Sequence, residues 1–489
     1  MTTRLSLATL AQLAPDVGPR VDPRALGVGI VHLGIGAFHR AHQAVYTEDA
    51  VAAAGGDWGI CGVSQRSSSV VDQLDPQDGL YTLAVRDGAG ERLRVVGAVR
   101  ELLWAQADAD AVRARIASPD TRLVTLTVTE KGYHHDPATN RLRLDSPDVA
   151  ADVADGGSRT VVGQLVGGLA QRRATDGGPV TILCCDNLPD NGGVLSGLVA
   201  DFVHRVPASD GLGDWIAANV TFPSTMVDRI TPATTEEDLA RIAAALGARD
   251  EGAVVTEPFT QWVIEDDFAA GRPAWERAGA ILTTDVRAYE QIKLRMLNGA
   301  HSTLAYLAQL ADCELVSDAT PFTGAIRTLM AVDVAPTLEV PEGFDLADYQ
   351  EELLSRFANP ALRHRTSQIA MDGSQKLPMR LLGTIRDRRR AGAEPVMASL
   401  GVAAWMRFVS ARRSDGGRAL AVNDPLADEI AHRLRGREQP DAVVNALLGM
   451  RQIFDDELAG DDGWRALLAD HLDALVRDGA RRTARRVAG

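Results

Sequence analysis

The stretch GVGIVHLGIGAFHRAH, residues 27–42, decides the fold of this chain. It begins with a largely apolar, β-branched run that predicts a strand, and Gly34 and Gly36 follow directly. A helical pattern then runs from about residue 38 to residue 54 and ends at a Gly-Gly pair, and residues 58–63 predict a second strand. Strand, glycine-rich turn, helix and strand form a βαβ unit, so the chain begins as an α/β protein.

The turn itself indicates a ligand. A dinucleotide-binding turn uses three glycines, for the tight turn, for close approach of the pyrophosphate and for helix packing. Here His39 stands at the third position, so the pattern is incomplete, although the strand–turn–helix context and the helix dipole are those of an anion site. We expect dinucleotide binding; a tight turn without a ligand is the alternative. The expected contacts come from Gly34, Gly36, Ala37, Phe38 and, by its charge, Arg40.

The choice between NAD and NADP stays open. An acidic residue near the end of the second strand usually holds the ribose hydroxyls of NAD. Here that strand runs into Ser64-Gln-Arg66-Ser-Ser-Ser, which contains no acid. Arg66 among serines is suited to a 2′-phosphate, and a plain polar loop is the alternative.

The remaining chain divides into two parts of different character. Further β-branched runs at 123–128 and 180–185 each follow a helical stretch, which indicates a mainly parallel sheet. Beyond about residue 285 strand signals nearly vanish and amphipathic helical patterns take over, beginning with 286–310. We therefore expect a Rossmann-like N-terminal domain over residues 1–285 and a mainly α-helical substrate and catalytic domain over residues 286–489.

Composition excludes several classes of protein. The 489 residues are 45% hydrophobic and 24% charged, which is typical of a globular protein. A net charge of −15 argues against nucleic-acid or anionic-membrane partners, and no apolar run approaches the length of a membrane span. The start of the chain lacks the pattern of a signal peptide. Cys61, Cys184, Cys185 and Cys313 match no zinc pattern or disulfide framework, so we expect a reduced, cytoplasmic enzyme without a metal, for which a monomer is plausible.

Lysine is scarce in this chain. Of 51 Lys and Arg residues only Lys131, Lys293 and Lys376 are lysine. Arginine stays protonated in proteins, whereas lysine can become neutral and exchange a proton. A lysine in so arginine-rich a chain is therefore a candidate for a position that arginine cannot fill. Chance survival is the alternative, and the neighbouring residues must decide.

Lys293 opens the segment KLRMLNGAH at the start of the predicted helix 286–310. In an α-helix Asn298 and His301 are neighbours, and Lys293 lies about 80° from His301 around the axis, so the three can line one wall of a pocket. A buried amine near other cations can act as a general base. The alternatives are an exposed lysine, a capping asparagine and a core histidine.

Two polar segments follow predicted strands. In open α/β sheets, ligands bind beyond the carboxyl ends of the strands. Asn187 follows the run 180–185, and its amide can donate a hydrogen bond to a developing alkoxide; simple turn formation is the alternative. Thr129, Glu130 and Lys131 follow the run 123–128 and are further candidates for cofactor binding.

Together these segments resemble the mannitol dehydrogenase family, the long-chain, metal-independent polyol dehydrogenases, which includes mannitol 2-dehydrogenase, arabinitol dehydrogenase and fructuronate reductase (mannonate oxidoreductase). The matching stretches are HLGIGAFHRAHQ (32–43), TEKGY (129–133), CDNLPDNG (185–192), MVDRITP (226–232), KLRMLNGAH (293–301) and NPALRHRTSQIAMDGSQKLP (359–378). They occur in order across both expected domains, and the K-x4-N-x2-H element is the most specific of them.

The resemblance implies NAD(H) on the glycine-rich turn and assigns roles to several polar residues. Lys293 would be the catalytic acid/base, and Asn187 and Asn298 would hold the substrate oxygen. The further contacts to the substrate would come from His301, Asp228 and Lys376.

One departure bears on the substrate. Mannitol dehydrogenases carry an arginine eight residues before the position of Lys376, where this chain has Gln368. The local run is closer to fructuronate reductase, which must recognise a carboxylate, and His364 or Arg365 could supply the charge. We therefore expect NAD(H)-dependent interconversion of D-mannonate and D-fructuronate, with mannitol 2-dehydrogenase or another hexitol or pentitol dehydrogenase as the alternative. The intact motifs argue against a non-catalytic nucleotide sensor.

Overall fold

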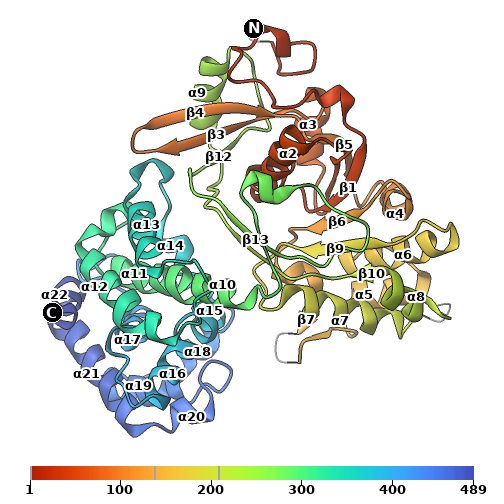
Figure 1. Cartoon of the computed structure of the whole chain (residues 1–489). Coiled ribbons are helices and arrows are strands. Elements are labelled where there is room, and N and C mark those ends of the chain that lie inside the picture. The colour runs from red at the N-terminus through yellow and green to blue at the C-terminus, as the bar shows by residue number, and fades with distance from the viewer. Residues whose placement is uncertain (1–2, 137–138, 207–209) are drawn as a thin grey trace. The chain divides into compact units, whose positions relative to one another are not determined.

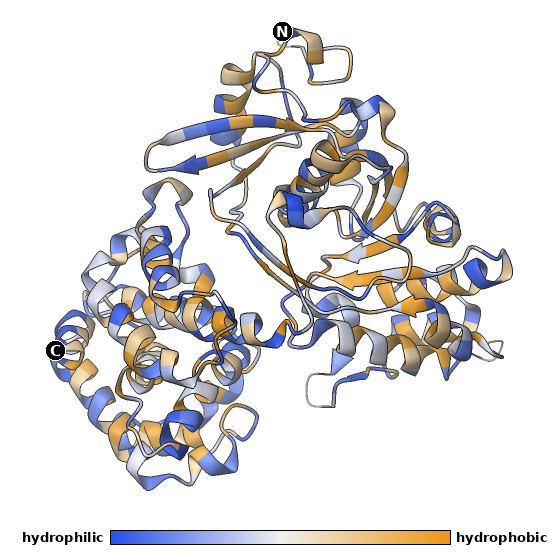
Figure 2. Ribbon diagram, viewed as in Figure 1, coloured by the Kyte–Doolittle hydropathy of each residue, from blue (hydrophilic) through white to orange (hydrophobic). Residues whose placement is uncertain are grey.

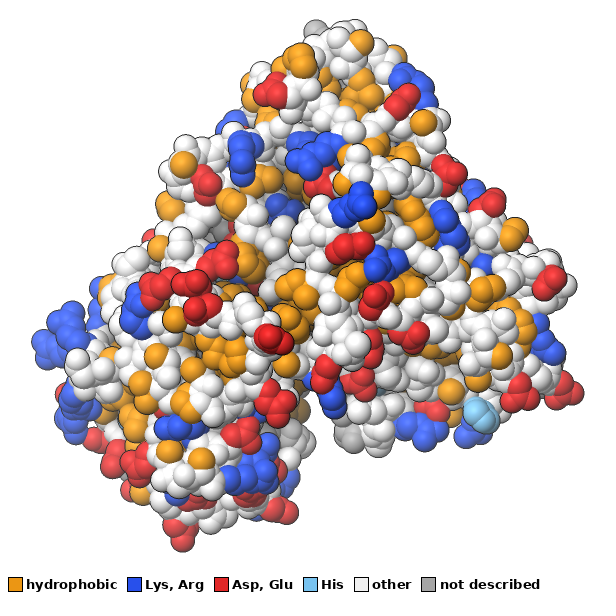
Figure 3. Space-filling view, in the orientation of Figure 1, with side chains coloured by type: hydrophobic (Ala, Val, Ile, Leu, Met, Phe, Trp, Pro, Cys, Tyr) orange, Lys and Arg blue, Asp and Glu red, His pale blue; other side chains and the backbone are white. Residues whose placement is uncertain are grey.

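The computed structural model describes residues 3–136, 139–206 and 210–489 (Figure 1). The chain forms two compact units, Met1–Arg287 and Ala288–Gly489, each with its own core. Among the described helices, none combines the length and the apolar composition needed to cross a membrane. Acidic and basic side chains are interspersed on the face seen in Figure 3.

The first unit is built on a six-stranded sheet whose neighbouring strands are all parallel. In order across the sheet they are β10 (Val220–Thr221), β9 (Val180–Cys184), β6 (Leu123–Leu126), β1 (Val28–Leu33), β2 (Gly59–Ser64) and β5 (Val99–Trp104). The first strand, β1, lies near the centre of the sheet and later strands are added on both sides of it, which is the strand order of a Rossmann fold. In the register, Val31 lies between Cys61 and Val124.

Both faces of this sheet are covered. One face packs under α4 (Ala109–Ala117), α6 (Val161–Ala174), α7 (Asn191–Val203) and α8 (Leu212–Asn219). The opposite face packs against α2 (Gln43–Ala54). Val31 and Leu33 enter the first core and Ile30 the second, because side chains alternate along a strand. Burial on both sides explains why the strands are continuous hydrophobic runs (Figure 2).

The helix expected over residues 38–54 is interrupted. A short helix α1 (Ala37–Ala41) and α2 meet at His42, whose backbone (φ −124°, ψ −90°) is not helical. The His42 ring packs against Phe38 at 5.1 Å and Trp262 at 5.7 Å between ring centroids. The break therefore coincides with a buried aromatic cluster, which the helical period of the sequence does not report.

Smaller sheets complete the first unit. They are β12 (Val254–Thr256) with β3 (Tyr81–Asp87) and β4 (Gly90–Val96), β11 (Thr225–Asp228) with β13 (Gln261–Glu265) and β14 (Ile281–Thr283), and the pair β7 (His135–Asp136) and β8 (Arg141–Leu142).

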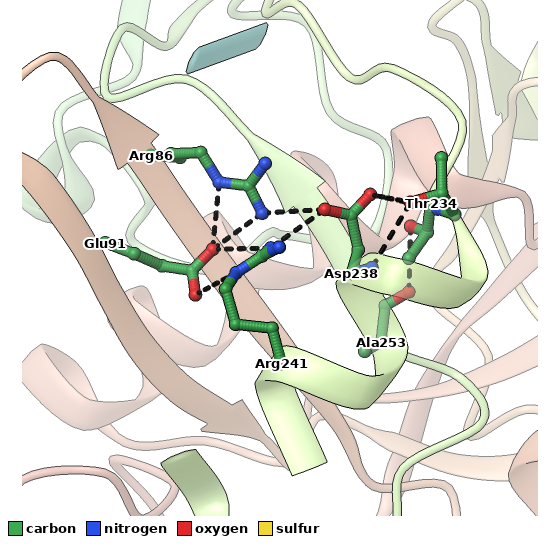
Figure 4. Close-up of polar contacts among 7 residues, drawn as sticks. Arg86, Glu91, Thr234, Asp238, Arg241 and Ala253 are labelled. Atoms are coloured by element: carbon green, nitrogen blue, oxygen red, sulfur yellow. Dashed lines mark hydrogen bonds and ion pairs between the residues drawn. The ribbon is translucent and has the colours of Figure 1, made fainter. Parts of the chain in front are cut away.

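An ion-pair network joins β3 and β4 to α9 (Glu236–Leu246) (Figure 4). Arg86 donates to Glu91 at 2.8 Å and to Asp238 at 2.9 Å, and Arg241 binds the same two carboxylates. Asp238 also forms a capping box with Thr235 at the start of the helix. Networks of this kind hold an element more firmly than isolated surface pairs do.

The second unit is helical. Its helices of eight or more residues are α11 (Ala300–Leu310), α13 (Leu346–Ala358), α16 (Gly383–Arg390), α17 (Val396–Ala411), α19 (Pro440–Leu448), α21 (Asp462–Asp478) and α22 (Ala480–Ala488). Shorter ones are α10 (Arg287–Ile292), α12 (Thr323–Thr328), α14 (Thr366–Ile369), α15 (Gly373–Leu377), α18 (Ala427–Arg433) and α20 (Asp456–Ala459). Every residue of α11 is buried, and α17 packs between α11 and α21. The expected fold class, Rossmann-like followed by mainly helical, is confirmed.

Candidate cofactor-binding and catalytic sites

The glycine-rich turn leaves β1 in a conformation that requires glycine. Gly34 has φ +101°, and a Cβ placed on it would lie 2.2 Å from the carbonyl oxygen of Thr127. Its amide donates to the carbonyl of Val63 at the end of β2 (2.8 Å). A Cβ at Gly36 would approach no atom closer than 3.9 Å, so the face above Gly36 is open to a ligand. This geometry fits the close backbone approach that a pyrophosphate needs.

His39 explains why the fingerprint lacks its third glycine. The ring stacks on His32 of β1, with centroids 3.4 Å apart and planes 15° apart, and both rings are buried. His32 is held by the hydroxyls of Thr125 (2.7 Å) and Thr127 (2.8 Å). The imidazole pair thus fills the space between strand and helix that a glycine would leave for direct backbone packing.

Arg40 is buried behind the turn rather than displayed on it. Its Nε donates to the carbonyl of Gly36 (3.3 Å) and its Nη1 to that of Gly252, and its exposed fraction is 6%. Burial lowers the pKa of this guanidinium. Arg40 therefore supports the turn through the carbonyl oxygen of Gly36, and its proposed contribution to cofactor binding is that of a buried charge behind the turn.

Arg66 stands exposed in the polar loop after β2. The Ser64 hydroxyl donates to the carbonyl of Ser67 (2.6 Å), and the hydroxyls of Ser67 and Ser69 lie 2.8 Å apart. The loop is thus ordered by its serines and presents its arginine outward, as a 2′-phosphate or ribose contact requires.

The other candidates of the first unit lie where strands end. Thr129 and Lys131 are exposed in the loop after β6, and the side chain of Glu130 lies outside the described part of the structure. Thr129 has φ +72° and ψ 155°, a conformation that costs a β-branched residue about 1–3 kcal/mol and is typical of functional sites. Asn187 is exposed after β9, and Asp228 is the buried last residue of β11.

In the second unit, the segment of Lys293 is not an α-helix. Residues Lys293–Gly299 form a π-helix between α10 and α11, with hydrogen bonds between residues five apart. The α-helical spacing expected here is therefore wrong: Lys293 and Asn298 are five residues apart and lie one wide turn from each other. Lys293 is buried, with 7% of its surface exposed, and Asn298 is half-buried.

A second π-helix, Pro378–Leu382, packs against the first. A Cβ on Gly299 would lie 2.7 Å from the carbonyl oxygen of Arg380, so the contact depends on glycine. Isolated π-turns inside helices are frequent at functional sites. Of the three π-helices among the described residues, one carries Lys293, one begins two residues after Lys376, and the third is Leu329–Val334.

His301 lies among aromatic and basic groups. Its ring stacks on Phe357 (5.0 Å) and meets His364 edge-on (5.1 Å), and its Nε2 has no hydrogen-bond partner among the described residues. Burial and then the charges of His364, Arg380, Arg356 and Lys376 hold its pKa well below the ordinary value. His301 is therefore neutral, with a nitrogen available to a hydroxyl.

The remaining candidates of the second unit differ in their hydrogen bonds and in their exposure. The Lys376 ammonium donates to the carbonyl of Ile369 (3.2 Å), and Arg380 donates to the hydroxyl of Ser302 (3.0 Å). His364 lies against His301, whereas Arg365 and Gln368 are exposed. Arg356 and Arg380 were not predicted. Arg380 follows Lys376 by four residues, a spacing that could have indicated a shared face.

Comparison with known proteins agrees with this geometry. Residues 28–277 match the family described as the mannitol dehydrogenase Rossmann domain, and residues 285–476 match the mannitol dehydrogenase C-terminal domain. The chain is 44% identical to an uncharacterised oxidoreductase of Escherichia coli K12, YeiQ, over 94% of this chain and 95% of that protein. It is 41% identical to the D-mannonate oxidoreductase of the same organism, covering 96% and 97%.

A solved structure gives the same result. The mannitol 2-dehydrogenase of Pseudomonas fluorescens, in a ternary complex with NAD and D-mannitol, is 35% identical, covers 99% of both chains and superposes with a TM-score of 0.88. Two family matches that together span most of the chain, and relatives above 40% identity along nearly its whole length, leave one assignment. The chain is an oxidoreductase of the mannitol dehydrogenase family.

Proposed function

We propose that this protein is an NAD(H)-dependent dehydrogenase that interconverts a secondary alcohol of an acyclic sugar acid and the corresponding ketone, with D-mannonate and D-fructuronate as the substrate pair. One observation supports the substrate class: basic side chains gather at the buried His301, whose ring stacks on Phe357, the residue after Arg356, and whose chain neighbour Ser302 accepts a hydrogen bond from Arg380 (3.0 Å). A carboxylate is the complementary group for such surroundings, and charge-assisted hydrogen bonds are the strong ones. The relative named D-mannonate oxidoreductase supports the same choice.

The proposed chemistry centres on Lys293. When oxidation begins, the neutral amine takes the proton of the substrate hydroxyl; in reduction the ammonium returns it. Asn298, one π-turn away, donates to the substrate oxygen, and we propose the same role for Asn187. The nicotinamide, when bound, accepts or supplies the hydride. Burial of Lys293 favours the neutral amine, which an arginine cannot provide.

The other roles are binding roles. The neutral His301 and the carboxylate of Asp228 would hold hydroxyls of the substrate. Lys376 would bind its far end, together with His364 and Arg365, of which His364 is the one in contact with His301.

The proposed cofactor is NAD(H), and the residues present fit it. Gly34 makes the tight turn against Thr127, and Gly36 leaves an approach for the pyrophosphate. Ala37 and Phe38 begin the following helix, and we propose that Thr129, Glu130 and Lys131, in the loop after β6, add further contacts. Arg66 is the residue proposed for the adenosine ribose, and it would accept the 2′-phosphate of NADP as well. The neighbour that was solved with NAD supports the first of these two cofactors.

We propose the cytoplasm as the place of action, because the four cysteines, all among the described residues, are buried thiols outside any disulfide and need no oxidising compartment. We expect a monomer, since each unit buries its own core.

The experiment compares substrates. NADH oxidation by the purified protein is followed with D-fructuronate and with D-fructose, and repeated with NADPH. We expect kcat/KM for fructuronate to exceed that for fructose by about a hundredfold or more, because a carboxylate forms charge-assisted hydrogen bonds that a neutral hydroxyl does not form. A preference for fructose would favour the alternative, a mannitol 2-dehydrogenase like the solved neighbour.

A further inference from the structure

The carboxylate of Asp186 holds a loop that belongs to another strand. Asp186 comes directly after Cys185 at the carboxyl end of β9 and is half-buried. Its Oδ2 accepts from the amide of Val128 (2.8 Å) and the hydroxyl of Tyr133 (2.6 Å), and its Oδ1 accepts from the amide of Thr129 (2.9 Å). All three donors lie in the loop that follows β6. A single side chain therefore ties together the polar ends of two strands.

The loop that Asp186 holds is pressed against the dinucleotide turn. The Thr127 hydroxyl donates to the carbonyl of Gly34 (2.9 Å), and the carbonyl oxygen of Thr127 occupies the place where a Cβ of Gly34 would lie. The next two amides, those of Val128 and Thr129, are the ones that Asp186 binds. The same pair of bonds stabilises the positive φ of Thr129, a conformation that this residue does not adopt readily by itself.

The hydroxyl of Tyr133 donates its hydrogen bond to the carboxylate of Asp186 and does not lose its proton. The side chain is fully buried, and burial, then the neighbouring Cys184 and Asp186, raise the pKa of its hydroxyl well above the ordinary value. The hydroxyl therefore keeps its proton at any physiological pH.

The backbone of Asp186 is held from the other side. Its carbonyl accepts from the amide of Leu188 (2.9 Å) and from the side-chain amide of Asn191 (3.0 Å). Asn191 also exchanges two hydrogen bonds of 2.9 Å with Thr225, the first residue of the strand that ends at Asp228. With side chain and carbonyl both fixed, the peptide leading into Asn187 has one direction.

We propose that Asp186 is a positioning residue for the dehydrogenase reaction. Its carboxylate sets the loop of residues 127–133 against the dinucleotide turn, and through the adjacent peptide it orients the amide of Asn187 toward the reacting oxygen. This role rests on the proposed function for Asn187, but its cofactor side does not, since binding of NADH is measured without a substrate.

A matched control exists in the same unit. Asp152, in α5 (Pro147–Asp155), also binds two successive backbone amides, those of Arg159 (3.0 Å) and Thr160 (2.8 Å), and a hydroxyl, that of Thr160 (2.8 Å). It is fully buried and holds the segment that leads into α6, not the loop of residues 127–133. Asp152 also pairs with the guanidinium of Arg159 (3.2 Å), so Asp152→Asn disturbs the corresponding backbone and hydroxyl hydrogen bonds and, in addition, one ion pair.

The test measures the NADH dissociation constant by fluorescence, kcat with fructuronate and the unfolding temperature for both variants. We expect both to be less stable, whereas only D186N weakens NADH binding and lowers kcat, each by about tenfold or more, because small displacements of positioned groups cost rate steeply. The double variant D186N/N187A should lose little more kcat than N187A alone, since the two residues act through one amide. Equal dissociation constants and kcat values in D186N and D152N, or additive kcat losses in the double variant, would overturn the proposal.

If D186N does not fold, Tyr133→Phe tests the same positioning role with a smaller change. It removes one donor and leaves the carboxylate and both amide bonds, so we expect changes in the same direction of about threefold. Unchanged NADH affinity and kcat in Y133F would contradict a positioning role. If the wild-type protein binds NADH but reduces no sugar acid, the proposed function fails while the effect of D186N on NADH affinity is still measured.

Discussion

At the scale of single residues, the stacked His32–His39 pair couples the dinucleotide turn to pH. Burial lowers the pKa of His32 from 6.5 to about 3, and burial followed by nearby positive charge holds the pKa of His39 well below its ordinary value. The folded protein therefore keeps both rings neutral, whereas the unfolded chain binds protons below about pH 6.5. The stability that the neutral pair contributes is complete above about pH 6.5 and is lost as the pH falls toward 3.

This predicts a difference in pH dependence between two proteins. His39→Gln removes one titrating ring, so the free energy of unfolding should fall less steeply with decreasing pH, by about 1.4 kcal/mol per pH unit below about pH 6. Urea unfolding of the wild-type protein and H39Q from about pH 7 to about pH 4.5 measures both slopes. Carboxylates titrate in both proteins and cancel in the comparison. Parallel curves would show that His39 is protonated in the folded state.

At the scale of elements, the contact between the two π-helices depends on Gly299. A Cβ there would lie 2.7 Å from the backbone carbonyl of Arg380, and backbone cannot move aside as a flexible side chain can. Gly299→Ala should destabilise the protein by about 1–3 kcal/mol and also lower kcat, because it separates the segments of Lys293 and Lys376.

Gly324 supplies the control for this substitution. It is an exposed glycine of the helix α12, and a Cβ there would meet no atom within 4 Å. Gly324→Ala should be neutral or stabilising by up to about 1 kcal/mol, as alanine is the better helix former. The test measures the unfolding temperature and kcat of both variants. If G299A were as stable and as active as G324A, the close contact at Gly299 would be dispensable.

Also at the scale of elements, the sequence predicted which segments are strands and helices better than it predicted their local geometry. The π-helix at Lys293–Gly299 was not predicted because its apolar positions suit an α-helix as well as a π-helix. The segment against which it packs, Pro378–Leu382, is distant in sequence. The break at His42 was not predicted because the aromatic cluster against which the His42 ring packs includes Trp262, which is distant in sequence. Both are tertiary effects on a locally helical pattern.

At the scale of the whole molecule, the parallel sheet and the helical second half were predictable from long runs of consistent period. The positions of Gly34, Lys293 and His301 were predictable because their motifs are local. The basic surroundings of His301 were not, since Arg356 and Arg380 lie 55 and 79 residues further along the chain and only folding brings their charges to bear on it. A net charge of −15 likewise gave no indication of a cationic neighbourhood inside.

The central claim, that proton transfer runs through a neutral lysine, is tested most directly by Lys293→Arg. This variant has a side chain of similar reach that stays protonated and cannot exchange the proton, so kcat with fructuronate should fall by about a hundredfold or more while the NADH dissociation constant stays within about twofold. Retention of most of the wild-type kcat by K293R would contradict the assignment of Lys293 as the acid/base.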